Sequence, residues 1–214
     1  MVGRREALLA LAALLLRTRR AWSDDCPPER LEAALREIAQ ARAAVTTLTG
    51  PFVQERTIGL LAAKVRSTGT LTLVRPDRLR WELAPPDEAV YWILPEGLAY
   101  KSKAGQGRLD GTSDRIAAGL DDLRILLGGD LSRLRARYDL SASCSGSDPV
   151  VAFTATPKPG QVTPATRIAL TLAPDRVSPR TAVLSFGARD KTEITFGALQ
   201  KNVAVDPAKM RPSG

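Results

Sequence analysis

The sequence predicts a curved antiparallel sheet of ten or eleven strands with helices on one side. Short segments rich in β-branched and aromatic residues recur at regular spacing, and turn residues such as Arg75-Pro76-Asp77 and Pro95-Glu96-Gly97 separate them. Two further segments, 27–48 and 113–135, carry apolar residues at helical spacing. The chain has 214 residues, a length that suits one globular domain with a sizeable core.

The first helix is predicted over residues 27–48, directly before the strands. Pro27 and Pro28 suit the first helical turn, where a missing backbone N–H does no harm. Gly50-Pro51 is expected to end the helix. The apolar residues that share one helical face are Leu31, Ala34, Leu35, Ile38, Ala41, Val45 and Leu48.

The strands are expected in two groups, one on each side of the second helical segment. The first group covers 52–59, 64–75, 78–84, 89–94 and 97–102, and the second covers 137–144, 150–156, 166–173, 180–187 and 192–199. In the first group Leu79, Trp81 and Leu83 alternate with charged residues and therefore share a face. The segment 88–94, EAVYWIL, has no polar face. We expect it to be buried on both sides, or to meet on its second face something that the sequence does not show.

The second helical segment is expected to lie over the sheet. Its apolar stripe consists of Ile116, Leu120, Leu123, Leu126 and Leu127. Gly128-Gly129 is expected to end this helix before a short turn through Leu131 and Leu134.

The composition excludes most familiar catalytic and metal chemistry. Histidine is absent, so no Ser-His or Cys-His pair and no His-ligated zinc site can form. Two cysteines are too few for an all-thiolate metal site, and the sequence has no G-x-S-x-G motif and no evident carboxylate constellation. We therefore expect no enzyme, no cofactor and no metal, with a lipid hydrolase as the enzymatic alternative.

Residues 1–23 are predicted to be a secretory signal peptide, and residues 24–214 a single exported domain. Arg4-Arg5 precedes the apolar run from Ala7 to Leu16, and Ala21-Trp22-Ser23 offers small residues for cleavage. An N-terminal amphipathic helix is the alternative. The predicted leader carries half of the net charge of +8. The body is therefore only mildly basic, and we expect no nucleic-acid partner.

The predicted export bears on the state of the two cysteines. In an oxidising compartment Cys26 and Cys144 can form one disulfide, with two unrelated thiols as the alternative. Such a bridge would stabilise the fold by about 4 kcal/mol, because it closes a long loop in the unfolded chain. It would tie the N-terminal segment to the body.

Residues 52–100 carry an ordered set of motifs. Phe52-x-Gln54 is followed by Gly69-x-Leu71, Arg75-Pro76, Trp81 and Tyr100, and GTLTLVRPDRLRW is the most specific piece. Together these motifs resemble the LolA family, periplasmic carriers that move lipoproteins to the outer membrane. The preceding helix and the segment from Asn202 to Gly214 are similar to the family's opening helix and closing strand.

The resemblance implies a mainly β fold, an unclosed antiparallel β-barrel covered by an α lid, whose apolar cavity takes up acyl chains. In the family, the arginine of the Arg-Pro pair helps to hold the lid closed, which implies a latch role for Arg75; a solvated turn residue is the alternative. The residues expected to line the acyl cavity are Phe52, Leu71, Leu73, Leu79, Trp81, Leu83, Tyr91, Ile93, Leu123, Leu126 and Leu127. Plain core packing is the alternative for Leu79, Trp81 and Leu83.

The implied function is a monomeric periplasmic carrier that shuttles acylated lipoproteins from the inner to the outer membrane. Its implied donor is an inner-membrane ABC-type extractor, and its implied acceptor lies at the outer membrane. Two alternatives use the same scaffold: a regulatory module that senses lipids or lipoproteins, and a carrier of a glycolipid or other lipid. Lys101 and Lys103 are expected to belong to a solvated loop, with contact to anionic headgroups as the alternative.

Overall fold

The computed structural model describes residues 25–61, 63–109, 115–144 and 148–212. The predicted signal peptide lies outside the described residues. The strands are β1 (Thr47–Ile58), β2 (Ala63–Val74), β3 (Arg78–Leu83), β4 (Ala89–Leu94), β5 (Gly97–Ser102), β6 (Gly105–Leu109), β7 (Tyr138–Ser143), β8 (Ala152–Pro157), β9 (Arg167–Leu172), β10 (Pro179–Ser185), β11 (Lys191–Phe196) and β12 (Gln200–Lys201). All of them belong to one 12-stranded sheet.

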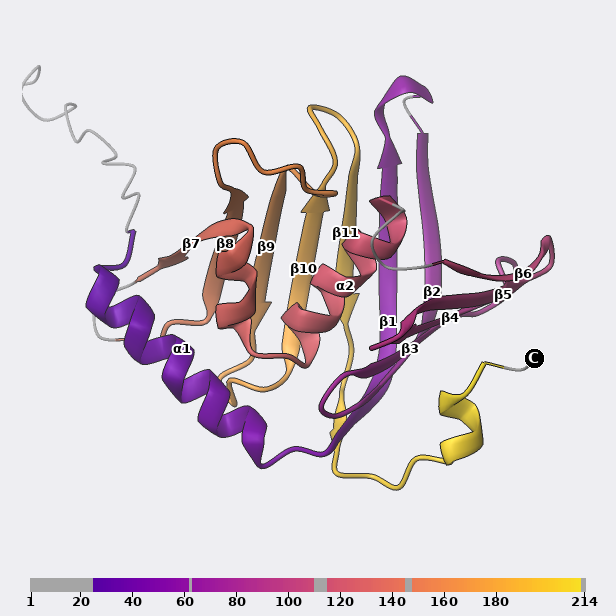
Figure 1. Cartoon of the computed structure of the whole chain (residues 1–214), viewed down its shortest axis with the longest axis horizontal. Helices are drawn as coiled ribbons and strands as arrows, with labels where there is room; N and C mark the ends of the chain where they lie inside the picture. The colour runs from indigo at the N-terminus through magenta and orange to yellow at the C-terminus, as the bar shows by residue number, and fades with distance from the viewer. Residues whose placement is uncertain (1–24, 62, 110–114, 145–147, 213–214) are drawn as a thin grey trace, which may run out of the picture.

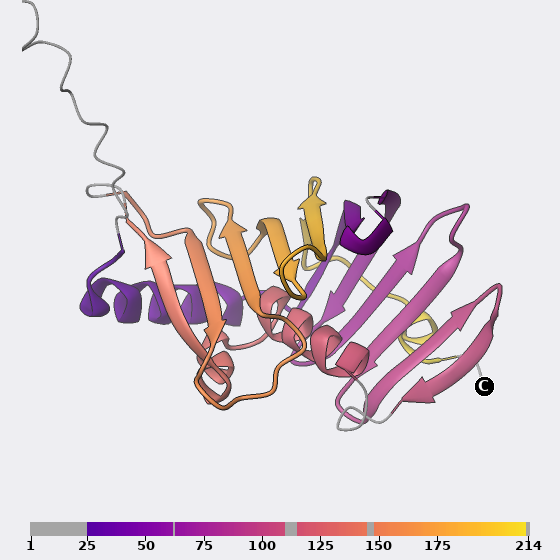
Figure 2. The same cartoon turned by 90° about the horizontal axis from the view of Figure 1, so that it is seen from above.

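The sheet is antiparallel and does not close into a barrel. Its strand order is β6-β5-β4-β3-β2-β1-β11-β10-β9-β8-β7, and β12 pairs with β1 beside this path. Figure 2 shows how strongly the sheet curves. This architecture confirms the predicted open, mainly β fold. The first and last strand groups meet where β1 pairs with β11, so that Phe52 lies opposite Phe196.

Two strands were not expected from the sequence, and both have weak signals. β6 contains two glycines and no apolar alternation, and it forms only because it returns beside β5 as a hairpin. β12 has just two residues, which pair with Leu48 and Thr49 of β1. The structure therefore has more strands than the predicted ten or eleven. One added strand lacks apolar alternation, and the other is very short and pairs with a strand that is distant in sequence.

The first helix is shorter than predicted. α1 spans Pro28–Ala43, and Leu48 of the expected helical stripe instead belongs to β1. Leu48 is fully buried there and lies opposite Leu73 of β2. Gly50-Pro51 does not end a helix but lies inside β1, where the Pro51 carbonyl accepts the Gly197 N–H at 2.9 Å. The ladder to β2 and β12 outweighs the helical spacing of the apolar residues.

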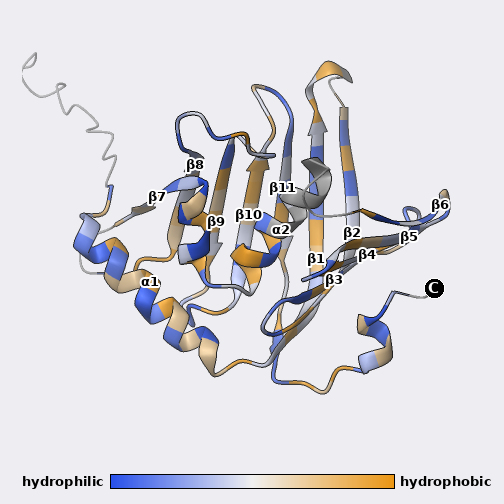
Figure 3. Ribbon diagram, in the orientation of Figure 1, coloured by the Kyte–Doolittle hydropathy of each residue, from blue (hydrophilic) through white to orange (hydrophobic). Residues whose placement is uncertain are grey.

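The main core lies between the concave face of the sheet and the helices. Leu71, Leu73 and Leu79 are fully buried on this face, and the ring of Phe52 stacks on Trp81 with centroids 3.8 Å apart. α2 (Arg115–Leu127) crosses this face, followed by the short helix η3 (Leu131–Ala136) (Figures 1 and 2). In Figure 3, orange marks the hydrophobic residues of the sheet and of the helices.

The second face of β4 meets the C-terminal segment. Trp92 and Leu94 alternate with the core residue Ile93 and therefore point to the convex side. The Trp92 indole donates to the carbonyl oxygen of Lys209 at 2.8 Å, in the short helix η4 (Pro207–Met210). Trp92, Leu94 and the core residue Ile93 are all buried, so the apolar strand of segment 88–94 is covered on both sides, which is the first of the two alternatives.

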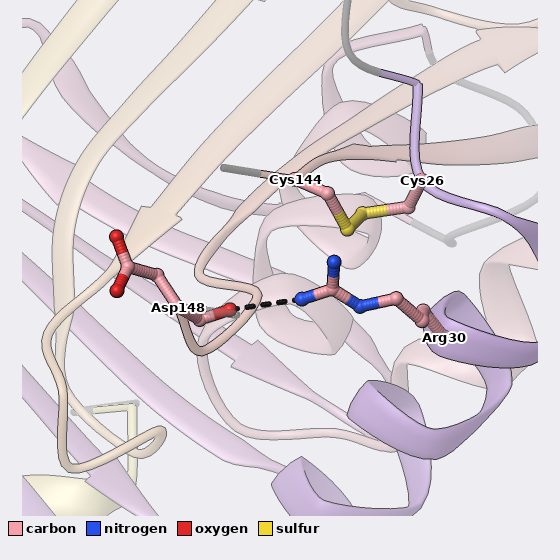
Figure 4. Close-up of a disulfide and its surroundings, with 4 residues drawn as sticks. All are labelled: Cys26, Arg30, Cys144 and Asp148. Carbon is pink, nitrogen blue, oxygen red and sulfur yellow. Dashed lines mark hydrogen bonds between the residues drawn. A yellow bond between two sulfur atoms is a disulfide. The ribbon is translucent and has the colours of Figure 1, made fainter. Parts of the chain in front are cut away.

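A disulfide joins Cys26, just before α1, to Cys144, just after β7, with Cα atoms 5.0 Å apart (Figure 4). Two neighbouring bonds support it: the Cys26 N–H donates to the Ala142 carbonyl at 2.9 Å, and Arg30 donates to the Asp148 carbonyl at 3.0 Å. The bridge therefore fixes the start of α1 to an edge strand of the sheet. Within the described residues, no helix has the length and apolar character needed to span a membrane.

Candidate functional site

A hollow of about 510 Å³ lies between the concave face of the sheet and α2. This volume is in the range of small-molecule pockets in proteins. The side chains of its apolar floor and cover are Trp81, Leu83, Tyr91, Leu184, Ile194 and, from α2, Leu123. Polar side chains gather toward its mouth, among them Gln54, Arg56 and Thr192. An apolar interior with a polar mouth suits a ligand with a hydrocarbon part and a polar end.

Only some of the predicted cavity residues line this hollow. Trp81, Leu83, Tyr91 and Leu123 do so. The remaining predicted residues are buried in the surrounding core: Phe52, Leu71, Leu73, Leu79, Ile93, Leu126 and Leu127. Their contact with an acyl chain stays a prediction, and it would require the helix to move away from the sheet.

The second strand group supplies part of the lining that sequence reasoning missed. Leu184 and Ile194 face the hollow from β10 and β11. Each stands in a strand with apolar residues at every second position, as in Ala182 and Leu184. That alternation was available in the sequence. What it could not provide was the pairing of β11 with β1, which brings Ile194 opposite Gln54.

A larger hollow of about 1050 Å³ lies on the other face of the same strands. Its lining includes Val53, Thr70, Glu82 and Lys101. The first three alternate with core residues such as Trp81 and therefore face away from the core. The lining of this larger hollow mixes such polar groups with apolar ones, and it comes from strands and turns alone. We assign the candidate site to the concave hollow because Gly119 and Leu123 of α2 cover it.

Arg42 of α1 holds the C-terminal end of α2. It donates from Nη2 to the Leu126 carbonyl at 2.7 Å and from Nη1 to the Gly129 carbonyl at 2.9 Å. Carbonyls at this end of a helix lack intrahelical partners and favour a cation. Burial, and secondarily the nearby Arg75, lowers the pKa of Arg42 to about 9, so the guanidinium is charged at neutral pH.

Arg75, the predicted latch, takes no part in this contact. Its backbone N–H donates to the Thr46 carbonyl at 2.9 Å, and its Nε is buried without a hydrogen-bond partner among the described residues. Burial lowers the pKa of Arg75. The latch role of Arg75 therefore stays a prediction, while Arg42 donates to the backbone carbonyls at the C-terminal end of α2. Its sequence signal was its position four residues after Ile38, on the apolar stripe of α1.

A buried carboxylate anchors the middle of α2. Asp122 is fully buried, accepts the Tyr138 hydroxyl at 2.6 Å and pairs with Arg137. Burial, and then this hydrogen bond, raises the pKa of Tyr138 above its ordinary value. On the other side of the helix, Arg124 donates to the Asp77 carbonyl at 3.1 Å, in the turn between β2 and β3. The second half of α2 is therefore tied to α1, to β7 and to the β2–β3 turn.

The arrangement offers an apolar surface to a ligand. No group of three or more residues able to hold a metal ion occurs in the described part of the chain. The polar groups around α2 bond to one another or to backbone carbonyls, and the floor of the hollow is apolar. Such a site takes up a ligand by burying its apolar surface.

An open antiparallel sheet with an apolar hollow under a helix defines the class of fold. Residues 43–92 match the family described as outer membrane lipoprotein carrier protein LolA. This stretch runs from the end of α1 into β4 and includes Phe52, Arg75 and Trp81. Over residues 43–92 the chain is therefore similar to the LolA family, as its motifs predicted. Among curated protein sequences, none matches this chain.

Two solved structures with low sequence identity have TM-scores above 0.5 and are similar in fold. A DUF1329 family protein from Desulfovibrio piger ATCC 29098 has a TM-score of 0.51 at 12% identity, over 86% of this chain and 98% of that chain. An uncharacterized conserved protein from Thermus thermophilus has a TM-score of 0.52 at 7% identity, over 86% and 94%. A LolA superfamily protein from Nitrosomonas europaea has a lower TM-score of 0.46 at 8% identity, over 84% and 96%.

Proposed function

We propose that the protein is a periplasmic carrier, which shelters the acyl chains of a lipoprotein in the hollow under α2 and shuttles it from the inner to the outer membrane. The observation that carries this proposal is the hollow of about 510 Å³, with its apolar floor and helical cover. The match of residues 43–92 to a family of lipoprotein carriers supports the same function.

Burial of hydrocarbon supplies the binding energy. Each methylene group removed from water contributes about 0.8 kcal/mol, without any directed polar contact. Trp81, Leu83 and Ile194 provide apolar surface for the chain. Gln54 and Arg56 at the mouth can hydrogen-bond to the polar end of the cargo, which stays near water.

The anchors of α2 provide a way to release the cargo. An acyl chain that reaches past Leu123 toward Leu126 and Leu127 has to displace the helix, because these two side chains are buried in the core. Displacement breaks the contact from Arg42 to the Leu126 carbonyl. The cost of opening lowers the apparent affinity for cargo, and an acceptor that binds more tightly can then take it over.

The location and partners belong to the same proposal. A disulfide such as Cys26–Cys144 persists in oxidising compartments, which supports export to the periplasm. An inner-membrane ABC-type extractor as donor and an outer-membrane acceptor are proposed from the family resemblance. We propose that the carrier works as a monomer and without a cofactor.

Native mass spectrometry of residues 24–214, purified from the periplasm, tests the proposal. A bound acylated polypeptide is the expected result. Free lipid or glycolipid in its place would keep the hollow as a binding site and change the cargo. An empty protein that also fails to bind an added synthetic lipopeptide would contradict the carrier function.

Two tryptophans on opposite faces of the sheet locate the cargo. Trp81 lines the hollow, whereas Trp92 faces the C-terminal segment. In residues 24–214 the variant Trp92→Phe leaves Trp81 as the single tryptophan, and Trp81→Phe leaves Trp92. A lipopeptide with brominated acyl chains should quench the fluorescence of Trp81 and leave that of Trp92 nearly unchanged. Equal quenching in the two variants would place the cargo elsewhere.

A further inference from the structure

The large apolar side chains that the described residues expose all lie at one rim of the sheet. They are Leu60 (93% exposed), Val162 (91%), Val65 (44%) and Phe186 (41%). Leu60 belongs to the short helix η2 (Gly59–Leu61) between β1 and β2, beside Val65 at the start of β2. Val162 lies in the β8–β9 loop and Phe186 in the β10–β11 turn. Figure 1 shows these three connections together at the top of the sheet.

Direct contacts hold these connections in place. The Gly59 N–H donates to Asp190 Oδ1 at 2.7 Å, which joins η2 to the β10–β11 turn. The Gly187 N–H donates to Thr166 Oγ1 at 3.2 Å, which joins that turn to the end of the β8–β9 loop. The Phe186 N–H donates to the Asp190 carbonyl at 2.8 Å and closes the turn itself. The exposed apolar tips are therefore presented by a connected rim.

The rim is also strongly basic. We define it as residues 56–61, 63–66, 158–167 and 186–191, in which Asp190 is the single acidic residue. The basic residues of the rim are Arg56, Lys64, Arg66, Lys158, Arg167, Arg189 and Lys191. Asp190 accepts the hydrogen bond from the Gly59 N–H, and Lys191 pairs with Glu193 at 3.0 Å. Arg56, Lys64, Arg66 and Arg189 form no ion pair with the described residues.

The same rim surrounds the mouth of the hollow. Ile58, Pro164 and Phe186 line the hollow and belong to three different segments of the rim. Exposed apolar tips among unpaired cations are the combination that binds the interface of an anionic bilayer, because the tips enter the headgroup region while the cations meet lipid phosphates. The core of a protein–protein interface is depleted of charged residues, whereas these apolar tips stand among cations.

We propose that this rim docks on an anionic phospholipid bilayer, with Leu60, Val162 and Phe186 inserted and the basic residues on the headgroups. Docking in this orientation points the mouth of the hollow at the membrane. The proposal goes beyond cargo carriage and does not depend on it, since a protein without cargo should also bind the bilayer.

Vesicle flotation tests the proposal with residues 24–214, which contain the whole described sheet, both α-helices and the disulfide. Removal of the apolar leader prevents it from binding vesicles itself. We expect binding to vesicles of phosphatidylcholine mixed with phosphatidylglycerol, and little binding to phosphatidylcholine alone. The variant Leu60→Ser with Phe186→Ser should weaken binding at least about tenfold, because the insertion energy is lost.

A second pair of variants separates rim charge from total charge. Lys64→Gln with Arg66→Gln should weaken binding roughly 25-fold, since each basic residue near an anionic surface contributes about fivefold. The matched control Arg36→Gln with Arg180→Gln removes the same charge from α1 and from the start of β10, at the end of that strand away from the rim, and should change binding little. Unaltered circular dichroism of all variants, expected for exposed positions, shows that folding is retained.

Two results would overturn the proposal. Equal weakening in the rim and control variants would mean that the vesicles attract the protein by its overall charge. Absence of binding to the anionic vesicles would mean that the rim does not dock on a bilayer and that its exposed apolar side chains contact a protein partner instead. Both results are independent of cargo in the hollow, so the carrier function is judged separately by mass spectrometry.

Discussion

Arg42 and Leu126 join the first helix to the helix that covers the hollow, through a hydrogen bond of 2.7 Å from Nη2 to the carbonyl oxygen. Arg42 is 1% exposed, so its charge has exchanged water for two backbone carbonyls at the end of α2. The contact is polar and lies inside an apolar core. It therefore stabilises the position of α2 against the sheet, and both hydrogen bonds of Arg42 break when α2 moves away.

Replacement of Arg42 by methionine should loosen α2. Two carbonyls at the end of the helix lose their donor, and each buried unsatisfied group costs about 1–3 kcal/mol, partly offset by relief from burying a charge. We expect the free energy of unfolding to fall by about 2 kcal/mol in urea denaturation. Hydrogen exchange at Gly128 and Gly129, whose N–H groups bond to Arg124 and Ile125, should become faster.

The control for this variant is Arg36→Met, an exposed arginine on the same helix. It should change the free energy of unfolding by less than about 0.5 kcal/mol. If both variants lose the same stability, the loss reflects helix composition and not the contact to α2.

Loss of the disulfide should weaken the whole fold. Because Cys26 and Cys144 are 118 residues apart, the bridge restricts a long loop in the unfolded chain. The double variant Cys26→Ser with Cys144→Ser should lose about 4 kcal/mol in the free energy of unfolding. Reduced wild-type protein provides the control and should match the variant, since the described residues hold no other cysteine. An unchanged unfolding curve after reduction would show that the bridge does not form in solution.

Tyr138 should link stability to alkaline pH. Its pKa in the folded protein is raised, first by burial and then by its bond to Asp122. A group with a raised folded pKa contributes stability that is full below its ordinary pKa of about 10 and is lost as the pH rises above that value. We expect the urea midpoint of the wild type to fall above this pH, and phenolate absorbance of one tyrosine to appear only on unfolding. In Tyr138→Phe this late absorbance should be absent; identical titrations would contradict the assignment.

A methyl group on Gly69 should disrupt the floor of the core. Gly69 lies opposite Phe52 in the pairing of β1 with β2, and the ring of Phe52 covers it. A Cβ at Gly69 would overlap the Glu82 carbonyl oxygen and lie 2.5 Å from Cζ of Phe52. Gly69→Ala should therefore lower the free energy of unfolding by about 1–3 kcal/mol in urea denaturation. The control Gly119→Ala, where the nearest atom is 3.5 Å away, should be neutral or slightly stabilising.

The alternation of residues along the strands was the part of the fold that the sequence predicted best. Leu79 and Trp81 face the core as expected, because a buried face imposes a period of two on a strand. Leu48 shows the limit of such reasoning. It fits the helical stripe of α1, yet strand pairing with Leu73 places it in β1. Pairing is a tertiary interaction, and no local pattern contains it.

The candidate site was predicted in part for the same reason. Trp81 and Leu123 were found because each belongs to a clear apolar pattern near a recognised motif. Ile194 was missed because its strand joins the site through β1, more than a hundred residues away in the chain. The role of Arg42 was missed for another reason. A single arginine on an apolar helix face predicts no partner until the carbonyls that it contacts are known.

The attachment of α1 at both ends has a mechanical consequence. The disulfide fixes its start to β7, and its end leads directly into β1 in the middle of the sheet. α1 therefore acts as a rigid strut across the half of the sheet formed by β7 to β11, and it sets the span of that half. No second strut of this kind crosses β2 to β6 in the described residues. In the proposed carrier, we expect a cargo larger than the resting hollow to displace the half of the sheet formed by β2 to β6, while the half held by α1 keeps its position.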